Sequence, residues 1–371
     1  MDTAFGRLMA MSFGRPVDRV AVDLGTFGPA ALRSESTAGK SLTRQALVCR
    51  PPAIPANTLC LHAEASAAVG SDFLRQGWHG HATDVRRPTT AVPSMRVSRG
   101  AVWLLGHQAG MLLPPRDVSV LKLPDAPPWP LDTSDPTPAR MPQVRSLAPP
   151  IEGPKQLLDT LLGRGTASAV LLEPAGLSEQ LLDWAFETCA EAYRRVLHAL
   201  PRQPHVIWLE DDFTAMADCA SAERLLPRWR AWLREFANRD VLVGLKGDTH
   251  CLPLLSDLVR AGVHIVSLAG IAAHPVSTLR KILPAHVILH GTVDFATLSS
   301  ALNRGRAQDL LGIAADLARA WPVIASPQAP LPARLPLTEI RWCADYLKTL
   351  GLGDAQARRE IIAEQAPHPS R

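Results

Sequence analysis

The sequence predicts an α/β fold, a (β/α)8 TIM barrel whose N-terminal third is irregular and rich in proline. Between Val241 and Asp294, three short apolar runs alternate with two helix-like segments. Buried parallel strands have this form because helices cover both faces of their sheet. Further strand candidates recur at intervals of roughly 20–35 residues in the second half of the chain. No GxGxxG follows a strand, so the dinucleotide-binding fingerprint is missing. An open doubly wound sheet stays the alternative.

Composition sets the limits on domain organisation and on partners. The 371 residues are 47% apolar and 20% charged, with a net charge of +4. An α/β barrel of this length forms one unit, so we expect residues 1–350 to be one domain and 351–371 a C-terminal helix and tail. No basic block points to nucleic acid, and no run of about 18 apolar residues predicts a membrane span. The six cysteines are scattered and no signal peptide is expected, which favours free thiols and a cytoplasmic location.

Residues 1–150 carry few regular elements. A short helix is expected over Met1–Ser12, and a strand over Arg19–Leu24 (RVAVDL). Prolines cluster at positions 51–55, at 114–115 and from 124 to 142, and such stretches connect elements because proline lacks the backbone donor. A hairpin is predicted around residues 95–113, with Arg99-Gly100 as its turn.

Residues 151–350 show regular βα repeats. The long helix, for example, carries apolar residues at a spacing of three to four positions. The expected strands are Ala169–Leu172, His205–Leu209, Val241–Leu245, Val263–Leu268, Val287–Leu289 and Val323–Ala325. The expected helices are Pro154–Leu162, Ser178–Leu200, Ser221–Asn238, Ala296–Leu302, Arg306–Ala320, Leu337–Leu350 and Asp354–Ala366.

The side chains that follow the strands are the candidate site, because ligands bind beyond the carboxyl ends of barrel strands. Glu210, Asp211 and Asp212 follow one strand. Three ionised carboxylates cannot share one small cavity, and the pKa of one of them would rise, which suits general acid chemistry, metal binding or pairing with Lys246. Helix capping is the alternative for one or two of them, Asp212 above all.

The next strand ends add further polar candidates. Lys246 could neutralise an anionic substrate group or form a structural ion pair, and Asp248 could bind substrate or cap a helix. His290 could be a proton donor, a ligand or a hydrogen-bonded histidine of the rim. Asp294 and Gln328 complete the set. We expect catalytic roles for Glu210, Asp211, Lys246, His290 and Asp294, and substrate binding by Asp212, Asp248 and Gln328.

No metal site is predicted. His250 and Cys251 are adjacent, so they project differently, and no third ligand stands at a standard spacing. His79, His81 and Asp84 form a loose HxH cluster in the irregular third, which by itself is a weak signal for zinc.

Taken together, these segments resemble the uroporphyrinogen decarboxylase superfamily, which includes the corrinoid-linked methyltransferases. FGRPVDRVAVDLGTFG resembles the entry segment with "pDRvPv", and LPDAPPWPLDTSDP the connector with "WPdpdDp". VIWLEDDF resembles the strand that ends in paired acids, and VGLKGDTHCLPLLSDLVRAGVHIVSL the segment "HxCGd…ll.dl.e.Gvd.l". ILHGTVDFATL resembles "l.GnvDp..Ll", and VIASPQAPLPARLPLTEI the closing "G…p..TPlEni".

The resemblance implies a barrel whose mouth binds a tetrapyrrole, a corrinoid-bound methyl group or a small methyl donor. Two departures modify that expectation. The zinc-binding His-x-Cys of the methyltransferases aligns with Gly244 and Lys246, and the later cysteine with Gln328 or Ala329, so the zinc set is missing. The arginine-rich "RQAGRY" segment, which holds substrate carboxylates in the decarboxylases, is also missing.

The sequence therefore predicts a methyltransferase-type enzyme that acts on a small molecule or a corrinoid, without zinc. Lys246 would be a fixed positive charge at the lost zinc position. A decarboxylase acting on a porphyrin-like acid, which needs no cofactor, is the alternative enzyme. A non-catalytic binding or partner subunit is the alternative from another class. A corrinoid carried by a partner protein and a homodimer are both compatible with the sequence.

Overall fold

The computed structural model describes part of the chain. The described residues are 3–13, 15, 17–24, 66, 68–76, 96–98, 101–103, 121–122, 144–147, 153–162, 176–200, 202–211, 219–237, 241–284, 286–293, 316–318, 320–327, 331 and 335–348.

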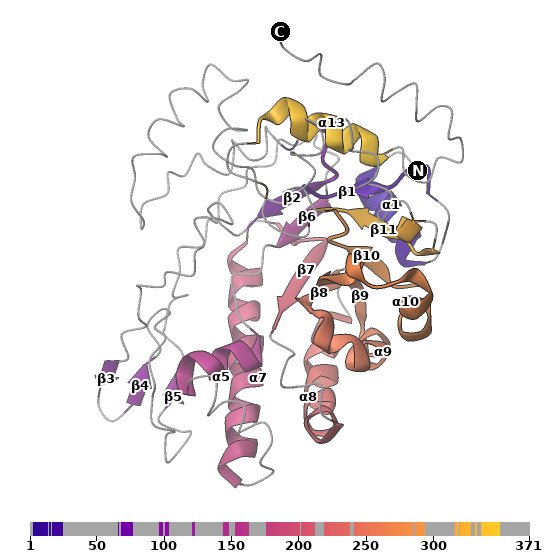
Figure 1. Ribbon diagram of the computed structural model, residues 1–371. Coiled ribbons are helices and arrows are strands. Elements are labelled where there is room, and N and C mark those ends of the chain that lie inside the picture. Colours follow the sequence, from indigo (N-terminus) through magenta and orange to yellow (C-terminus); the bar gives the residue numbers. More distant parts are fainter. Residues whose placement is uncertain are drawn as a thin grey trace.

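Eight parallel strands form a nearly closed barrel, which confirms the predicted (β/α)8 fold (Figure 1). Their order in the sheet is β1-β11-β10-β9-β8-β7-β6-β2, and every neighbouring pair is parallel. The strands are β1 (Ala21–Val22), β2 (Phe73–Gln76), β6 (Val144–Leu147), β7 (Val206–Glu210), β8 (Leu242–Asp248), β9 (Val263–Ala269), β10 (Ile288–His290) and β11 (Val323–Ala325).

The helices lie outside this sheet (Figure 1). They are α1 (Ala4–Ser12), α5 (Pro154–Leu162), α7 (Gly176–Ala199), α8 (Cys219–Ala237), α9 (Leu252–Ala261), α10 (Val276–Ile282) and α13 (Leu337–Lys348). Two short 3-10 turns, η2 (Thr249–Cys251) and η3 (Ile271–Ala273), follow β8 and β9. Among the described helices none is both long enough and apolar enough to cross a membrane.

Most predicted elements that fall on described residues agree with the structure to within a few residues. The predicted helices Ala296–Leu302 and Asp354–Ala366, and most of Arg306–Ala320, lie outside the described residues. The predicted hairpin corresponds to β3 (Arg96–Ser98) and β4 (Ala101–Trp103), which pair antiparallel, and β5 (Leu121–Lys122) adds a third strand to this small sheet. The predicted strand at 169–172 lies outside the described residues, and the barrel has its eight strands without it. Strands β2 and β6 belong to the eight and were not predicted from the sequence.

Side chains alternate between two apolar cores. One core, inside the barrel, holds Ala21, Phe73, Val144, Val206, Trp208, Leu242, Ile265, Ile288 and Ile324. Ala4, Leu8 and Met11 of α1 pack on it from the end where the strands begin. The other core lies between the outer faces of the strands and the helices, and contains for example Leu209, Leu245, Val266 and Leu289. Because side chains alternate along a strand, each inward residue predicts the next inward position two residues later.

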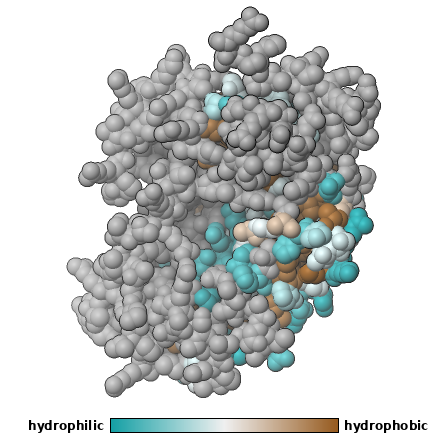
Figure 2. All heavy atoms as spheres, viewed as in Figure 1, coloured by the Kyte–Doolittle hydropathy of each residue, from teal (hydrophilic) through white to brown (hydrophobic). Residues whose placement is uncertain are grey.

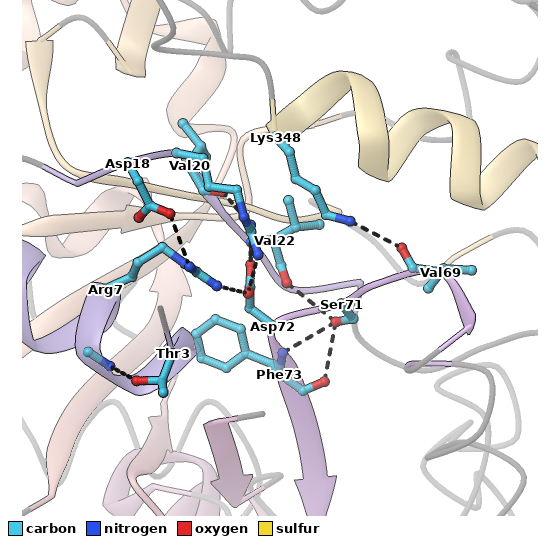
Figure 3. Close-up of polar contacts among 12 residues, drawn as sticks. Thr3, Arg7, Asp18, Val20, Val22, Val69, Ser71, Asp72, Phe73 and Lys348 are labelled. Carbon is cyan, nitrogen blue, oxygen red and sulfur yellow. Dashed lines mark hydrogen bonds and ion pairs between the residues drawn. The ribbon is translucent and has the colours of Figure 1, made fainter. Parts of the chain in front are cut away.

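Asp72 connects β1 to β2, the two ends of the sheet (Figure 3). Its backbone N–H donates to Val22 O at 2.8 Å, and its carboxylate accepts from Val22 N at 2.9 Å. Arg7 and Arg19 donate to the same carboxylate at 2.7–2.8 Å. Burial acts to raise the pKa of Asp72, but the bonds from Arg19, Val22 and Arg7 outweigh it and lower that pKa. This network holds the barrel closed at its N-terminal end.

Figure 2 shows hydrophilic residues mixed with hydrophobic ones over the region that Figure 1 labels α9 and α10. Among the described residues, Phe13 is the exposed large hydrophobic side chain. Arg224 and Arg228 of α8 pair with acids of α7, as Arg228 does with Glu179 and Asp183, and Arg230 pairs with Asp257 of α9. These ion pairs are those of a charged helix face, and the expectation that the chain binds no nucleic acid stays a prediction.

Candidate functional site

A row of polar residues runs along the barrel wall, across the neighbouring strands β7 to β10, where these strands end. Glu210 is in register with Lys246, Lys246 with Ser267, and Ser267 with His290. Glu210, Lys246 and Ser267 are each partly exposed, whereas the residues two positions earlier, Trp208 and Ile265, are fully buried. The row therefore lies between the packed interior of the barrel and its solvent-exposed mouth. Barrel enzymes bind their substrates at this end.

His290, the last residue of this row, is buried together with Asp23. His290 Nε2 is 3.0 Å from Asp23 Oδ2, and His290 Nδ1 is 2.9 Å from Ser267 Oγ. His290 is 4% exposed and Asp23 is 1% exposed. A buried carboxylate is stable when it is paired and hydrogen-bonded, and here the imidazole contributes to that pairing. The three side chains form a continuous path from the buried carboxylate to Ser267, a partly exposed residue.

Trp208 forms the floor of the mouth. Its indole N–H donates to Ser146 Oγ at 2.7 Å, and its ring centroid lies 4.7 Å from that of His290. Lys246 Nζ stands over the Trp208 ring, 5.2 Å from the centroid. A cation over an indole face gains about 0.5–2 kcal/mol, depending on its desolvation. Trp208 therefore fixes the positions of both the imidazole and the ammonium.

The absence of a side chain at Gly244 makes room for this tryptophan. A Cβ at residue 244 would lie 2.5 Å from Cε3 and Cζ3 of Trp208, which is far inside van der Waals contact. The buried Tyr193 hydroxyl donates to the Trp208 carbonyl from the helix side. Burial raises the pKa of Tyr193 well above its ordinary value, so the phenol keeps its proton.

Asp211 is engaged by α5. Its Oδ2 accepts from Lys155 N at 3.2 Å and its Oδ1 from Gln156 N at 3.0 Å, and the carboxylate is 2% exposed. Both donors belong to the first turn of the helix, where backbone N–H groups lack intrahelical partners. Gly153 allows this approach, since a Cβ there would lie 2.4 Å from the Asp211 carboxyl carbon. The geometry is that of a helix cap, and the catalytic role stays a prediction.

Asp248 caps the turn after β8. Its Oδ1 accepts from His250 N at 2.8 Å and lies 3.1 Å from His250 Nδ1. His250 thus faces Asp248 rather than Cys251, which is buried and whose pKa is raised to about 12 by burial. A thiol with that pKa stays protonated. Substrate binding by Asp248 stays a prediction.

Asp212, Asp294 and Gln328 lie outside the described residues, as does the cluster of His79, His81 and Asp84. Within the described ranges, no three His, Cys, Asp or Glu side chains gather in a way that could hold a metal ion. Cys189, Cys251 and Cys343 are buried thiols outside any disulfide of the described residues, in agreement with the expectation from their spacing.

The structure brings together residues that sequence reasoning chose and residues that it missed. Glu210, Lys246 and His290 share one row, as the strand-end argument predicted. Asp23, Ser267 and Trp208 were missed. A signal for Asp23 was present, since it ends the apolar run RVAVD in the same way that Glu210 ends VIWLE. Ser267 and Trp208 lie within apolar runs and carry no such signal.

Comparison with known proteins supports the fold. No family model matches the chain, and no curated protein matches it. Among solved structures, the chain is similar to a methyltransferase from Methanosarcina mazei, with a TM-score of 0.56 and 17% sequence identity. The match covers 96% of this chain and 98% of that chain. At this identity the likeness establishes the (β/α)8 barrel over nearly the whole length, while the chemistry has to be argued from the mouth.

Proposed function

We propose that this chain is a methyltransferase-type barrel enzyme that transfers a methyl group from a small molecule held at the barrel mouth. The likeness to the Methanosarcina mazei methyltransferase over nearly the full length supports the proposal. So does the ordered set of motifs that resemble the uroporphyrinogen decarboxylase superfamily, and membership of that superfamily is part of the proposal.

The observation that carries the proposal is the buried Asp23–His290 pair at the end of the polar row. When a methyl group leaves a heteroatom X for a nucleophilic acceptor A⁻, the balance is R–X–CH3 + A⁻ + H⁺ → R–XH + A–CH3. The heteroatom must regain a proton, and histidine is the side chain best suited to supply it near neutral pH. Asp23 stabilises the imidazolium, and Ser267 connects His290 Nδ1 to the mouth.

Besides a proton, the leaving heteroatom needs a fixed positive charge beside it, and in this proposal Lys246 supplies that charge. Its ammonium stands over Trp208 and next in the row to Ser267. A positive charge preorganised where negative charge develops stabilises the transition state, because the surroundings need not reorganise during the reaction. In this proposal Lys246 and the proton from His290 activate the donor together.

Zinc activation does not fit these residues. The first two zinc positions implied by the resemblance carry Gly244 and Lys246, of which one lacks a side chain and the other repels a cation. Trp208 packs where any ligand side chain at residue 244 would start. The proposed reaction therefore does not use zinc. The proposed methyl acceptor is a reduced corrinoid, which a partner protein would deliver as a second substrate.

The described part of the mouth favours methyl transfer over decarboxylation of a porphyrin-like acid. Such a tetra-acid needs several cations. The described inward-facing groups at the strand ends instead set Glu210 beside Lys246, with Asp23 buried beside His290. Among the described strand-end residues, Lys246 beside carboxylates suits a small substrate with one polar centre.

The test is a demethylation assay with free, chemically reduced cobalamin as the methyl acceptor. Purified full-length protein is offered methanol, methylamines, dimethyl sulfide and methoxyphenol in turn, and loss of the Co(I) absorbance is followed. We expect turnover with at least one donor, and a fall of about 100-fold or more in His290→Gln. The matched control is His198→Gln, which changes an exposed histidine of α7 and should leave the rate unchanged. Failure of every donor, or an unchanged rate in His290→Gln, would overturn the proposal.

A further inference from the structure

Asp23, His290 and Ser267 have the connectivity of a nucleophile, a base and an orienting acid. Asp23 Oδ2 is 3.0 Å from one imidazole nitrogen, and Ser267 Oγ is 2.9 Å from the other. We assign the ring proton to His290 Nε2, because an ionised Asp23 only accepts hydrogen bonds, and this assignment leaves Nδ1 to accept from the Ser267 hydroxyl. A catalytic triad is recognised by this geometry and these roles, and it recurs on unrelated folds.

Exposure increases along the path in the direction that a nucleophile needs. Asp23 is 1% exposed and His290 is 4% exposed, whereas Ser267 is partly open to solvent. A molecule that enters the mouth therefore meets the serine first, and the base and the acid stay shielded from water. A hydroxyl that served only to hold the imidazole in place would not need this access.

Thr292 is the candidate donor for an oxyanion. It lies two residues beyond His290, after the end of β10 and the turn at Gly291 (φ +79°), and Val293 beside it packs in the outer core. Thr292 is 3% exposed, and its hydroxyl has no hydrogen-bond partner among the described residues. A buried hydroxyl without a partner costs free energy, and a ligand oxygen in the mouth would satisfy it.

We propose that Ser267 is a catalytic nucleophile for acyl transfer from esters of small carboxylic acids. Ser267 Oγ attacks the ester carbonyl carbon while its proton passes to His290 Nδ1, and Asp23 stabilises the imidazolium. When the C–O bond to the alcohol breaks, the imidazolium protonates the leaving alkoxide, and the acyl group stays on Ser267. Water then attacks the acyl carbon, its proton passes through His290, and the carboxylic acid leaves with Ser267 restored.

In each tetrahedral intermediate, the Thr292 hydroxyl donates to the oxyanion. Lys246, in register with Ser267, adds its positive charge. This activity goes beyond the proposed methyl transfer and does not depend on it, since it requires only the three connected side chains and their donors.

The experiment is covalent labelling of the full-length protein with a fluorophosphonate probe, in which serine oxygen displaces fluoride at phosphorus. Peptide mass spectrometry locates the label. We expect Ser267 to be labelled at least tenfold faster than Ser256 of α9, and the rate at Ser267 to fall about 100-fold or more in both His290→Gln and Asp23→Asn. Ser256→Ala should leave labelling of Ser267 unchanged. Ser267 labelled no faster than Ser256, or labelled equally fast without His290, would overturn the proposal.

A second variant guards against loss of folding. Ser267→Cys keeps a nucleophile of similar size, and its alkylation by iodoacetamide reports thiolate formation. We expect Ser267→Cys to react at least tenfold faster than the double variant Ser267→Cys/His290→Gln. Equal rates in two folded variants would show that His290 does not act as the base. Labelling and demethylation are separate measurements, so the failure of one proposal is distinguishable from the failure of the other.

Discussion

His290 Nε2 lies 3.0 Å from Asp23 Oδ2, although 267 positions separate the two residues in the chain. The barrel brings them together because β1 and β10 both flank β11. The pair is buried at the end of a row of polar side chains, and the proposals above depend on it. The rest of the barrel is the scaffold that holds this pair in place.

Asp72→Asn should destabilise the barrel by about 3–5 kcal/mol, because it leaves Arg7 and Arg19 without their shared carboxylate at a buried site. Urea unfolding followed by circular dichroism measures the change. Asp18→Asn is the matched control. Asp18 pairs with Arg7 at 3.3 Å but its side chain is 53% exposed, so a loss of less than about 1 kcal/mol is expected. Equal losses in both variants would contradict the closing role of Asp72.

Acid should destabilise the fold in two separate windows. Burial lowers the pKa of His205 from 6.5 to about 4. Its Nδ1 accepts from Arg145 N at 3.0 Å, which protonation would prevent. The unfolded chain binds this proton below pH 6.5 and the folded chain only near pH 4, so stability falls as pH drops from 6.5 to 4, by at most about 1.4 kcal/mol per unit. The contribution of Asp72, whose pKa is lowered, is present above 3.8 and is lost as pH falls further, through its folded pKa.

His205→Asn keeps an acceptor near the Nδ1 position but does not titrate. The dependence of unfolding free energy on pH between 6.5 and 4 should therefore flatten in this variant and persist in His198→Asn. A profile that is equally steep in His205→Asn would show that another group causes the loss.

Gly244→Ala should displace Trp208, because the added methyl group would lie 2.5 Å from two ring carbons. We expect a loss of about 1–3 kcal/mol in stability from overpacking. Trp208→Phe removes the outer ring atoms that would clash, so the alanine should cost less in that background. The coupling energy from a double-mutant cycle of thermal unfolding measures this dependence. Additive losses would mean that residue 244 does not act through Trp208.

Asp211→Asn should affect stability more than turnover. The carboxylate accepts two N–H bonds from α5, and an amide can accept only one of them, so a loss of about 0.5–2 kcal/mol is expected. Demethylation or ester hydrolysis should stay within about threefold of the wild-type rate when measured well below the unfolding temperature. A fall of about 100-fold would restore the catalytic role predicted for Asp211 from its place after the strand.

The sequence predicts much of the fold because the regular elements have clear local patterns of apolar residues. The runs that became β7 to β11 are apolar, short and bounded by helices, so their positions followed from periodicity. Strands β2 and β6 were missed because FLRQ and VRSL contain charged or polar residues, and VRSL also lies among prolines. Asp72, directly before β2, accepts at its carbonyl from Val144 N of β6, which is 72 residues away in the chain. Contacts of that range are not encoded in a local pattern.

The candidate site was also predictable in part: the sequence identified residues at the strand ends but not their partners. Strand ends identified Glu210, Lys246 and His290, because a parallel barrel gathers all strand ends at one mouth. The partner of His290 could not be found in this way, since a pattern shows which residues face inward but not which strands become neighbours. Capping likewise depends on tertiary position: Asp211 follows β7 but caps α5, which precedes β7 in the chain.

The account depends most directly on Asp23 and His290 acting as one unit. The measurement is the demethylation rate, with the best donor and reduced cobalamin, for wild type, Asp23→Asn, His290→Gln and the double variant, each checked for folding by circular dichroism. We predict that each single change lowers the rate about 100-fold or more and that the double variant is no slower than the slower single variant, because groups acting as a unit are not additive. A wild-type rate in Asp23→Asn, or losses that multiply in the double variant, would contradict the account.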